Sequence, residues 1–490
     1  MLKLMRILKV AGIVAAAVAI GGAVLYQFFG LRVVVYGGGT PRLAFVTPAS
    51  AQAAAIEEHR KTQATTPASD PAVLAPPAVT PVAASPSPDP GTGLAVSAPL
   101  VSSYWSDFRG PARDGHYAER PILTNWPKGE LTPLWKQPVG GGYASFVTAR
   151  IGTLDLAFTI EQRGSQEVVA AYDVATGRGR WTSKWAAEFK EFMGGDGPRA
   201  TPTYFDGYIY ALGALGELRA LDAATGRTIW RTNILTDAGA ANVQWGMSAA
   251  PLIVDANVVV LPGGSGGKSV VAYNHRTGAH AWSALDDRQA YVSPMLVTID
   301  GVRQLLVVSA SRMMGLAAEG GSVLWDYPWV TMYDVNAGQP LLIGRNRVFI
   351  SSGYDKGAAV IEVTMTGARG TVKEVWKNNR MKNQFSSSVL HDGHVYGLDE
   401  SILACVDAGT GALKWKGGRY GYGQIALASG HIIVLTEDGD MALVRATPEK
   451  HVELARFAAL DGKTWNHPAF SNGLLVVRNL KEMAAFDLRR

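Results

Sequence analysis

Four segments of the chain repeat one pattern of apolar and polar positions. In each, an apolar run ends in Asp or Asn, Thr-Gly follows after two residues, and Trp stands four positions after the Gly. The pattern predicts two strands and a turn, because Asx accepts hydrogen bonds from turn amides and Gly adopts the positive φ that a hairpin needs. A Trp at the end of the second strand can fill the wedge between neighbouring sheets. The copies occupy residues 171–181, 220–230, 272–282 and 405–415, and a degenerate fifth copy spans 321–325.

The spacing of these strand-ending aromatic residues predicts the number of repeats. Gaps of 39 to 52 residues separate successive positions, and a four-stranded propeller blade has this length. After the last position, three further strands are predicted at residues 466–470, 474–478 and 483–488, and residues 132–135 supply a fourth strand. This pairing joins the two ends of the repeat region and leaves no open sheet edge. We therefore predict an all-β fold, an eight-bladed β-propeller over residues 101–490. The strand-ending aromatic residues used for this count are Trp135, Trp181, Trp230, Trp282, Trp325, Trp376, Trp415 and Phe457.

The N-terminal region carries the pattern of a membrane anchor. Lys3, Arg6 and Lys9 precede an uncharged stretch at residues 10–31, long enough to cross the ~30 Å hydrocarbon core as a helix. The positive flank predicts that residues 1–9 are cytoplasmic and that the rest of the chain is periplasmic. A cleaved signal peptide is the alternative. Its apolar core would be longer than the usual ~7–15 residues, and the Ala-Ser-Ala pattern at 49–51 lies too far along. We expect a single-pass inner-membrane protein.

Residues 32–100 are expected to form a periplasmic segment and linker. Leu31 to Val46 predicts a short strand pair about a turn at residues 37–41. From about Gln52 to Val101 the sequence is rich in Ala, Pro, Ser and Thr, a composition that favours an extended, polyproline-like spacer.

Charge and cysteine content remove several classes of function. The chain has 46 basic and 41 acidic residues, too small a surplus to indicate a nucleic-acid partner. Cys405 is the only cysteine, so neither an intramolecular disulfide nor a cysteine-rich zinc site can form. The nine His residues show no paired metal-ligand spacing, and we predict no metal site.

A second repeat locates the candidate site. Each innermost strand begins with a small or polar residue, usually before Pro, and the loops ahead of these strands should meet at the mouth of the central channel. Aromatic rings with amide and guanidinium donors there suit a planar anion or a sugar, although a channel without a ligand also needs polar groups to satisfy its backbone and water. No catalytic arrangement can be assigned. The candidate ligand-binding residues are Arg199, Trp245, Tyr291, Gln339, Gln384, Tyr422, Gln424, Trp465, Asn466 and His467.

The Asp-x-x-Thr-Gly-x-x-x-Trp repeats resemble the pyrroloquinoline quinone (PQQ) repeat. That repeat builds eight-bladed propellers in quinoprotein alcohol dehydrogenases and in the non-catalytic outer-membrane-assembly lipoprotein. The segment from Trp105 to Gly115 is also similar to the start of a largely uncharacterised branch of PQQ-like propellers. Catalytic members resemble one another in a vicinal cysteine pair, an acidic calcium ligand and a catalytic Asp. The cysteine pair is absent here, no residue matches the others by motif, and the lipidated cysteine of the lipoprotein is missing as well.

Three functions follow from the repeat and the candidate site. A non-catalytic scaffold or binding module of the cell envelope would present its faces to envelope proteins or to a small polar ligand, without a cofactor. A PQQ-dependent oxidoreductase would bind PQQ with calcium, and a third class would bind glycans or peptides. The missing cysteine pair and the absence of a Cys-x-x-Cys-His cytochrome motif favour the scaffold.

Overall fold

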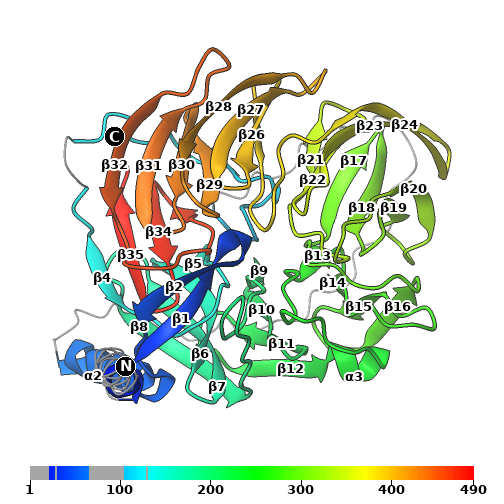
Figure 1. The fold of residues 1–490 in the computed structure, drawn as a ribbon. Helices are drawn as coiled ribbons and strands as arrows, with labels where there is room; N and C mark the ends of the chain where they lie inside the picture. The colour runs from blue at the N-terminus through cyan, green and yellow to red at the C-terminus, as the bar shows by residue number, and fades with distance from the viewer. Residues whose placement is uncertain (1–20, 28–29, 66–103, 128–130, 490) are drawn as a thin grey trace, which may run out of the picture.

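The computed structural model describes residues 21–27, 30–65, 104–127 and 131–489. Within these ranges, eight antiparallel sheets stand side by side around a central axis, as Figure 1 shows. Each sheet is one blade whose strands follow one another in the chain from the axis outward, except at the closing blade and at one sheet that gains a strand from before the first blade. The predicted eight-bladed propeller is therefore confirmed.

Seven of the eight blades are built from consecutive segments of the chain. The first four blades are β5 (Val147–Ile151), β6 (Leu154–Arg163), β7 (Gln166–Asp173), β8 (Gly179–Ala186); β9 (Thr203–Phe205), β10 (Tyr208–Leu212), β11 (Glu217–Asp222), β12 (Thr228–Asn233); β13 (Leu252–Val254), β14 (Asn257–Val260), β15 (Val270–Asn274), β16 (His280–Ala284); β17 (Met295–Ile299), β18 (Val302–Val308), β19 (Arg312–Ala317), β20 (Val323–Pro328). The next three are β21 (Leu341–Ile343), β22 (Arg347–Ser352), β23 (Gly357–Thr366), β24 (Arg369–Asn378); β25 (Val389–His391), β26 (His394–Asp399), β27 (Ile402–Asp407), β28 (Leu413–Arg419); β29 (Gln424–Ala428), β30 (His431–Leu435), β31 (Asp440–Arg445), β32 (Glu453–Ala458).

The ring closes in a blade made from both ends of the repeat region. β33 (Ala469–Ser471), β34 (Leu474–Arg478) and β35 (Glu482–Asp487) come from the C-terminal end, and β4 (Trp135–Pro138) adds the outer strand. β4 pairs antiparallel with β35, Trp135 opposite Ala485 and Pro138 opposite Glu482. The predicted closure is confirmed, but the closing strand begins at Trp135, where we expected it to end.

The middle strands carry the core because a blade is covered on both faces by its neighbours. β30 and β34 are almost continuous apolar runs, as expected for strands buried on both faces. The apolar clusters accordingly extend from one sheet to the next. One of them joins Phe158 of β6 to Ile209 of β10.

The blade tryptophans lie within the outermost strands, mostly near their starts, rather than at their ends as predicted. Trp181 is the third residue of β8, and its indole Nε1 donates to the backbone oxygen of Ala223 in the next blade (2.9 Å). Asp173 accepts hydrogen bonds from two amides of its turn, and Gly177 has φ of +72°. The predicted turn chemistry is therefore present, and the Trp links neighbouring blades by a hydrogen bond in addition to filling space.

The propeller has two faces, and each carries a different kind of connection between strands. The turn face carries the Asx turns, such as residues 173–177 and 222–226. The mouth face carries the loops that precede the innermost strands, such as residues 187–202 and 329–340. The short helix α3 (Ile234–Ala238), capped by the side chain of Asn233, also lies on the mouth face.

A segment before the first blade crosses the central channel. Its strand β3 (His116–Tyr117) pairs in parallel with β29 and makes that sheet five-stranded. Arg113 is 2% exposed and donates to the backbone oxygens of Pro294 (2.6 Å) and Pro251 (2.5 Å) in two neighbouring blades. Arg109 is 1% exposed and donates to the oxygen of Ser388 across the axis (2.7 Å). This segment therefore ties the inner strands together along the axis.

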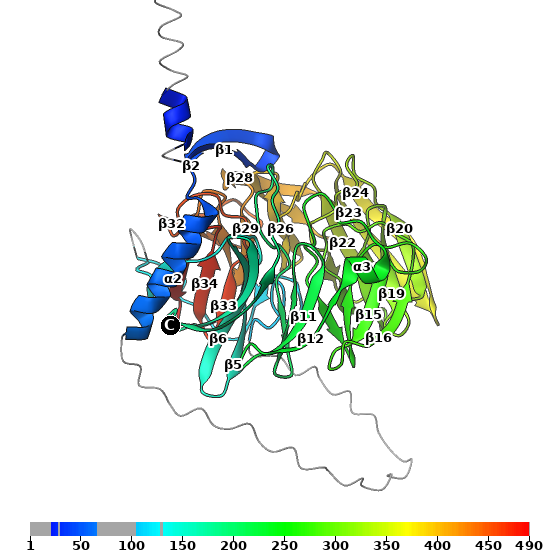
Figure 2. The same ribbon diagram turned by 90° about the horizontal axis from the view of Figure 1, so that it is seen from below.

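The N-terminal region folds onto the propeller. The predicted strand pair is confirmed as β1 (Leu31–Tyr36) and β2 (Thr40–Phe45), joined by the 3-10 turn η1 (Gly37–Gly39), and it lies across the mouth face in Figure 2. The first part of the predicted spacer is wrong. Residues 49–65 form helix α2 (Ala49–Thr65), which packs beside β4, with the Gln52 side chain donating to the oxygen of Val139 (2.8 Å). The rest of the spacer, 66–103, lies outside the described residues.

Most of the predicted membrane helix also lies outside the described residues. Residues 21–27 are helical, whereas Leu31, which we placed at the end of the span, belongs to β1. None of the helices in the described part of the chain has the length and apolar character needed to cross a bilayer.

Candidate functional site

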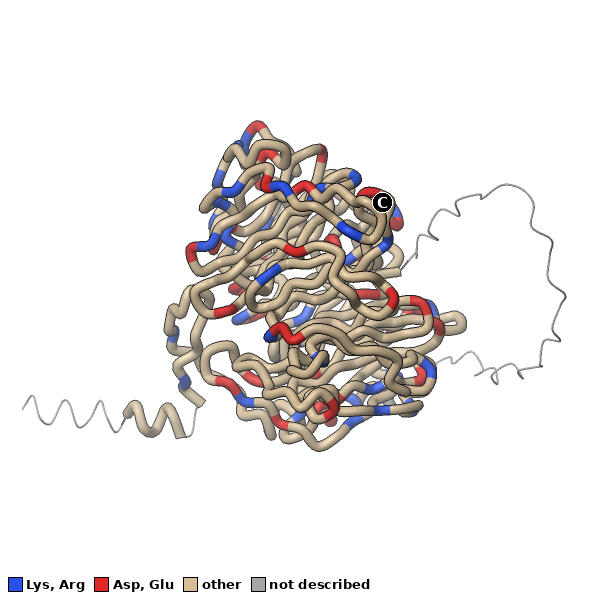
Figure 3. The backbone as a smooth tube through the Cα atoms, turned by 90° about the vertical axis from the view of Figure 1, so that its right-hand side faces the viewer, with Lys and Arg blue, Asp and Glu red and all other residues tan. Residues whose placement is uncertain are grey.

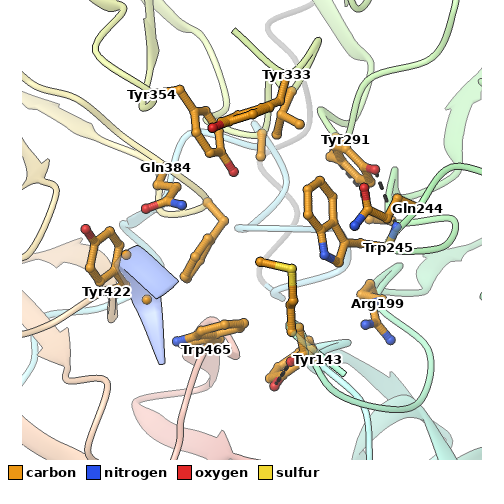
Figure 4. Close-up of a pocket in the computed structure, with 18 of the residues that line it drawn as sticks. Tyr143, Arg199, Gln244, Trp245, Tyr291, Tyr333, Tyr354, Gln384, Tyr422 and Trp465 are labelled. Atoms are coloured by element: carbon orange, nitrogen blue, oxygen red, sulfur yellow. Dashed lines mark hydrogen bonds between the residues drawn. The ribbon is translucent and has the colours of Figure 1, made fainter. Parts of the chain in front are cut away.

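A cavity of about 970 Å³ opens at the mouth face, where the loops ahead of the innermost strands converge. Figure 4 shows side chains from several blades pointing into it. The structure brings eight of the ten candidate residues to its wall: Arg199, Trp245, Tyr291, Gln384, Tyr422, Gln424, Trp465 and His467.

The other two candidates lie behind the wall. Gln339 is 2% exposed, and its side-chain amide donates to the oxygen of Ser293 (2.8 Å). Asn466 is fully buried and donates to the oxygen of Ala144 (2.9 Å). Both side chains cross-link adjacent loops and position the wall without lining the cavity.

Aromatic rings form most of the wall and support one another. The ring of Phe385 lies 4.3 Å from that of Trp465 and 5.7 Å from that of Tyr422, measured between centroids. On the opposite side, the rings of Trp245 and Tyr291 are 5.6 Å apart. Ring pairs in such tilted geometries stabilise each other, which holds the faces of the wall in place for a ligand.

The floor of the cavity comes from the axial segment. Phe108 meets the imidazole of His467 edge-on, with 5.0 Å between the ring centroids. Burial, assisted by the charge of Arg109, holds the pKa of His467 well below its usual range, so the imidazole is neutral at pH 7. Its Nδ1 has no hydrogen-bond partner among the described side chains and backbone groups. His467 therefore contributes a neutral imidazole to the base of the cavity.

Two basic side chains, Arg199 and Lys463, lie near the Tyr143 ring at one side of the cavity. The guanidinium of Arg199 lies 4.5 Å from the ring centre of Phe189 and donates to the oxygen of Gly195 (2.5 Å), and burial lowers its pKa. The ammonium of Lys463 lies 3.6 Å from the ring centre of Trp465. Burial lowers the pKa of Lys463 to about 7, although the nearby Glu437 opposes the shift. Side chains of this type can take an anionic or strongly polar ligand group.

The tip of the β1–β2 hairpin forms part of the rim. Its Gly37 amide donates to Oε1 of Glu437 (2.6 Å), which also accepts from the indole of Trp465 (2.9 Å). A Cβ atom on Gly37 would lie 2.1 Å from the Tyr422 ring, so a glycine is required for this close approach. The hairpin thereby contacts the cavity wall directly.

The sequence prediction missed several lining residues. Phe108 lies in the axial segment, Val35 to Gly39 lie in the hairpin, and Tyr333 and Tyr354 lie in mouth-face loops. The strand pair at 31–46 and the segment 105–115 were both visible as patterns. Nothing in the sequence placed them at the channel, because both are outside the repeats and are docked by tertiary contacts.

The residues that line the cavity decide whether it could bind PQQ with calcium, as in the catalytic PQQ proteins. Calcium takes about six to eight oxygen ligands, commonly carboxylates. The carboxylates that line the cavity are turned to other partners: Asp334 pairs with Arg288 (2.8 Å), and Asp355 (3.4 Å) and Glu400 (3.0 Å) both pair with Lys382. Nowhere in the described ranges are three Asp, Glu, His or Cys side chains grouped as metal ligands. The residues present do not fit a calcium-bound quinone.

Comparison with known proteins gives two kinds of match. The profile of the PQQ-repeat family described as outer membrane protein assembly factor BamB matches residues 165–417, slightly more than half of the chain. BamB of Yersinia pestis is 23% identical over 312 residues, which cover 60% of this chain and 75% of that protein.

Solved structures share the fold at low identity. The quinohemoprotein alcohol dehydrogenase from Comamonas testosteroni is 13% identical, with a TM-score of 0.54 over 79% of this chain and 81% of that one. The quinohemoprotein alcohol dehydrogenase ADHIIG from Pseudomonas putida HK5 is 12% identical, with a TM-score of 0.52 over 79% and 80%. At these identities the likeness concerns the architecture alone.

Proposed function

Because the chain belongs to the BamB-like family of PQQ-repeat propellers, we propose that it is a non-catalytic binding module of the cell envelope. In this proposal an N-terminal helix anchors it in the inner membrane and the propeller stands in the periplasm. Its partner is an envelope protein or a small polar ligand that enters the cavity at the mouth face.

The composition of the cavity wall carries this proposal. Aromatic faces and neutral amides, such as Trp245, Trp465 and Gln384, surround a base formed by Phe108 and a neutral imidazole. Recognition needs few charged groups and a firm apolar wall, whereas acid–base chemistry needs a titratable group poised in the cavity. Lys463, whose pKa is about 7, does not line the cavity, because its ammonium packs on the Trp465 ring and donates to a backbone oxygen (3.0 Å). The lining carboxylates are held in ion pairs at the rim. The wall is therefore better suited to binding than to catalysis.

The family also supports an envelope partner. The matching profile and the Yersinia pestis relative both carry the name of an outer membrane protein assembly factor. Binding residues of proteins commonly gather on loops that a rigid scaffold positions. We therefore place the partner site of this chain at the loops around the cavity.

A crosslinking experiment in cells tests the binding site. A photo-crosslinking amino acid replaces Trp245 at the cavity or, as the matched control, the exposed Phe205 on the turn face. We expect a discrete crosslinked product from position 245 that is lost when Arg199→Ala and Trp465→Ala are added, and no such product from position 205. Equal products from both positions would contradict the assignment.

An enzyme assay tests the non-catalytic part of the proposal. The purified protein is reconstituted with PQQ and calcium, and dye-linked oxidation of a panel of alcohols and sugars is measured. We expect no turnover above background. Turnover that depends on PQQ would overturn the binding module and establish an oxidoreductase.

A topology experiment tests the anchor. A reporter fused after Arg490 should be active only in a version that works in the periplasm, and neutral residues in place of Lys3, Arg6 and Lys9 should weaken that orientation. Mature protein that begins near Gln52 and stays in the soluble fraction would contradict it.

A further inference from the structure

The β1–β2 hairpin has two chemically different faces. Strand alternation and the pairing register put Leu31, Val33, Leu43 and Phe45 on one face, because Leu31 is opposite Phe45 and Val33 is opposite Leu43. Tyr36 belongs to the other face and is only 9% exposed. The face that carries Tyr36 therefore lies against the propeller, whereas the four apolar side chains point away from it, and only Val35, at the tip, reaches the cavity.

Contacts to the propeller confirm this orientation. The Arg42 guanidinium pairs with Asp438 (2.6 Å) and lies 4.0 Å from the ring centre of Tyr36. On the outward face, Leu43 is 72% exposed and Phe45 is 65% exposed. Exposed, neighbouring apolar side chains on a two-stranded ribbon indicate a surface that is covered in the working protein.

Exposed apolar side chains gather on this side of the molecule. The mouth-face loops add Phe192 (73%), Met332 (70%) and Tyr333 (63%), and the helical residues 21–27 precede the hairpin. Figure 2 shows that helix and the hairpin on the same side of the propeller. The large exposed apolar side chains of the described chain that lie elsewhere are Leu134, Phe205, Val323 and Leu454.

We propose that the outward face of the β1–β2 hairpin lies in the headgroup region of a lipid bilayer. The mouth face is then turned toward the membrane, and the partner of the cavity is one that reaches it at the membrane surface. This inference rests on the proposed membrane anchor and adds the orientation of the propeller. Apolar and aromatic side chains are stabilised at the boundary between acyl chains and headgroups. The hairpin is therefore a membrane contact that orients the mouth face toward the membrane.

Chain length favours a bilayer over a protein as the occupant of this surface. Residues 28–30 alone join the helix at 21–27 to β1, and three residues span at most ~11 Å when fully extended. A helix that leaves the bilayer at Gln27 therefore holds the hairpin within this distance of the membrane surface. The Arg32 side chain, which donates to the oxygen of Tyr26 (2.6 Å), fixes the corner between them.

The experiment uses the full chain in vesicles of phosphatidylethanolamine and phosphatidylglycerol. Cys405 is buried and burial raises the pKa of its thiol to about 11, so introduced cysteines can be labelled selectively with the fluorophore NBD. Labels are placed by Phe45→Cys on the hairpin, Ala16→Cys in the anchor and Phe205→Cys on the turn face as the control. Quenching by lipids with doxyl groups on their acyl chains is measured.

We expect the labels at positions 45 and 16 to be quenched at least several-fold more strongly than the label at position 205. Quenching at position 16 with none at position 45 would overturn the bilayer-facing mouth and leave the anchor standing. Loss of quenching at both positions would overturn the anchor as well. A label at position 45 that is shielded from aqueous iodide but unquenched by the lipids would show a protein on this surface and also overturn the proposal.

Discussion

On the turn face one contact recurs from blade to blade, whereas the loops of the mouth face differ in length and are held by contacts of their own. The indoles of Trp135, Trp181, Trp230, Trp376 and Trp415 each donate to a backbone oxygen of the next blade, over 2.8 to 2.9 Å. The mouth-face connection from β8 to β9 runs from Ala186 to Thr203, while that from β28 to β29 runs only from Arg419 to Gln424.

This difference separates stability from recognition. The repeated contact keeps neighbouring sheets at a constant spacing, so the ring does not depend on the sequence of the mouth loops. Those loops can then vary in length and side chains, as the wall formed by Trp245, Phe385 and Trp465 illustrates. Functional residues on variable loops over a rigid scaffold are a general feature of proteins.

The largest effect is expected when the closing strand is removed. Deletion of residues 131–138 eliminates β4, which supplies the outer pairing of the last blade and the Trp135 indole that bonds to Val174 (2.9 Å). The exposed edge of β35 should make the propeller aggregate. Size-exclusion chromatography and thermal unfolding measure this. Trp135→Ala, which keeps the strand, should remain monomeric, and a deletion that folds as well as the full chain would contradict the closure.

The next test places the same substitution on each face. Trp230→Ala removes a ring that packs between blades and donates to the oxygen of His275 (2.8 Å), and should lower the free energy of unfolding by roughly 3–5 kcal/mol. Trp245→Ala at the cavity, where the ring is only partly buried, should cost about 1 kcal/mol or less. Urea denaturation measures both. Equal costs would show that the two faces are not built differently.

The turn face was predictable from the sequence because each of its contacts recurs. An Asx, a Gly and a Trp at fixed spacing led to the blade number, the closure and the positive φ of Gly177, which the structure has at +72°. The sequence did not show that the Trp bonds to the next blade, since that contact joins two copies of the repeat.

The mouth face was predictable only in part. Arg199 and Trp465 could be placed near the cavity because they precede innermost strands, but Phe108 and Gly37 could not, because they lie before the first repeat. Helix α2 was missed because its Ala-rich sequence resembles the spacer that follows it, and its docking depends on contacts such as that of Gln52 with Val139.

Two glycines allow the packing of a blade tryptophan against the next blade to be measured separately from backbone strain. Gly226 and Gly207 both lie on the turn face with φ of +73° and +80°. A Cβ on Gly226 would lie 2.4 Å from the Trp181 ring, whereas one on Gly207 would meet no atom within 4 Å. Gly207→Ala should cost about 1–2 kcal/mol from backbone strain alone. Gly226→Ala should cost about 1–3 kcal/mol more because of overpacking. Equal costs would show that the Trp contact is not tight.

The least direct test concerns two buried titratable groups on the mouth-face half of the blades, which lie outside the repeated contacts of the turn face. Burial lowers the pKa of Lys463 to about 7 and raises that of Glu167 to about 7. The unfolded chain binds the extra proton for Lys463 between about pH 7 and its ordinary pKa, so this lysine makes stability rise with pH in that window. Glu167 binds its proton in the folded state between its ordinary pKa and about pH 7, so it makes stability fall as the pH rises through that window.

The free energy of unfolding of the wild type minus that of Lys463→Met should therefore increase above pH 7, by no more than about 1.4 kcal/mol per pH unit. The same difference for Glu167→Gln should decrease as the pH rises from 5 to about 7, and it should stay constant at higher pH. Urea denaturation from pH 5 to 9.5 measures both curves, and two curves of the same sign would contradict the burial of these groups.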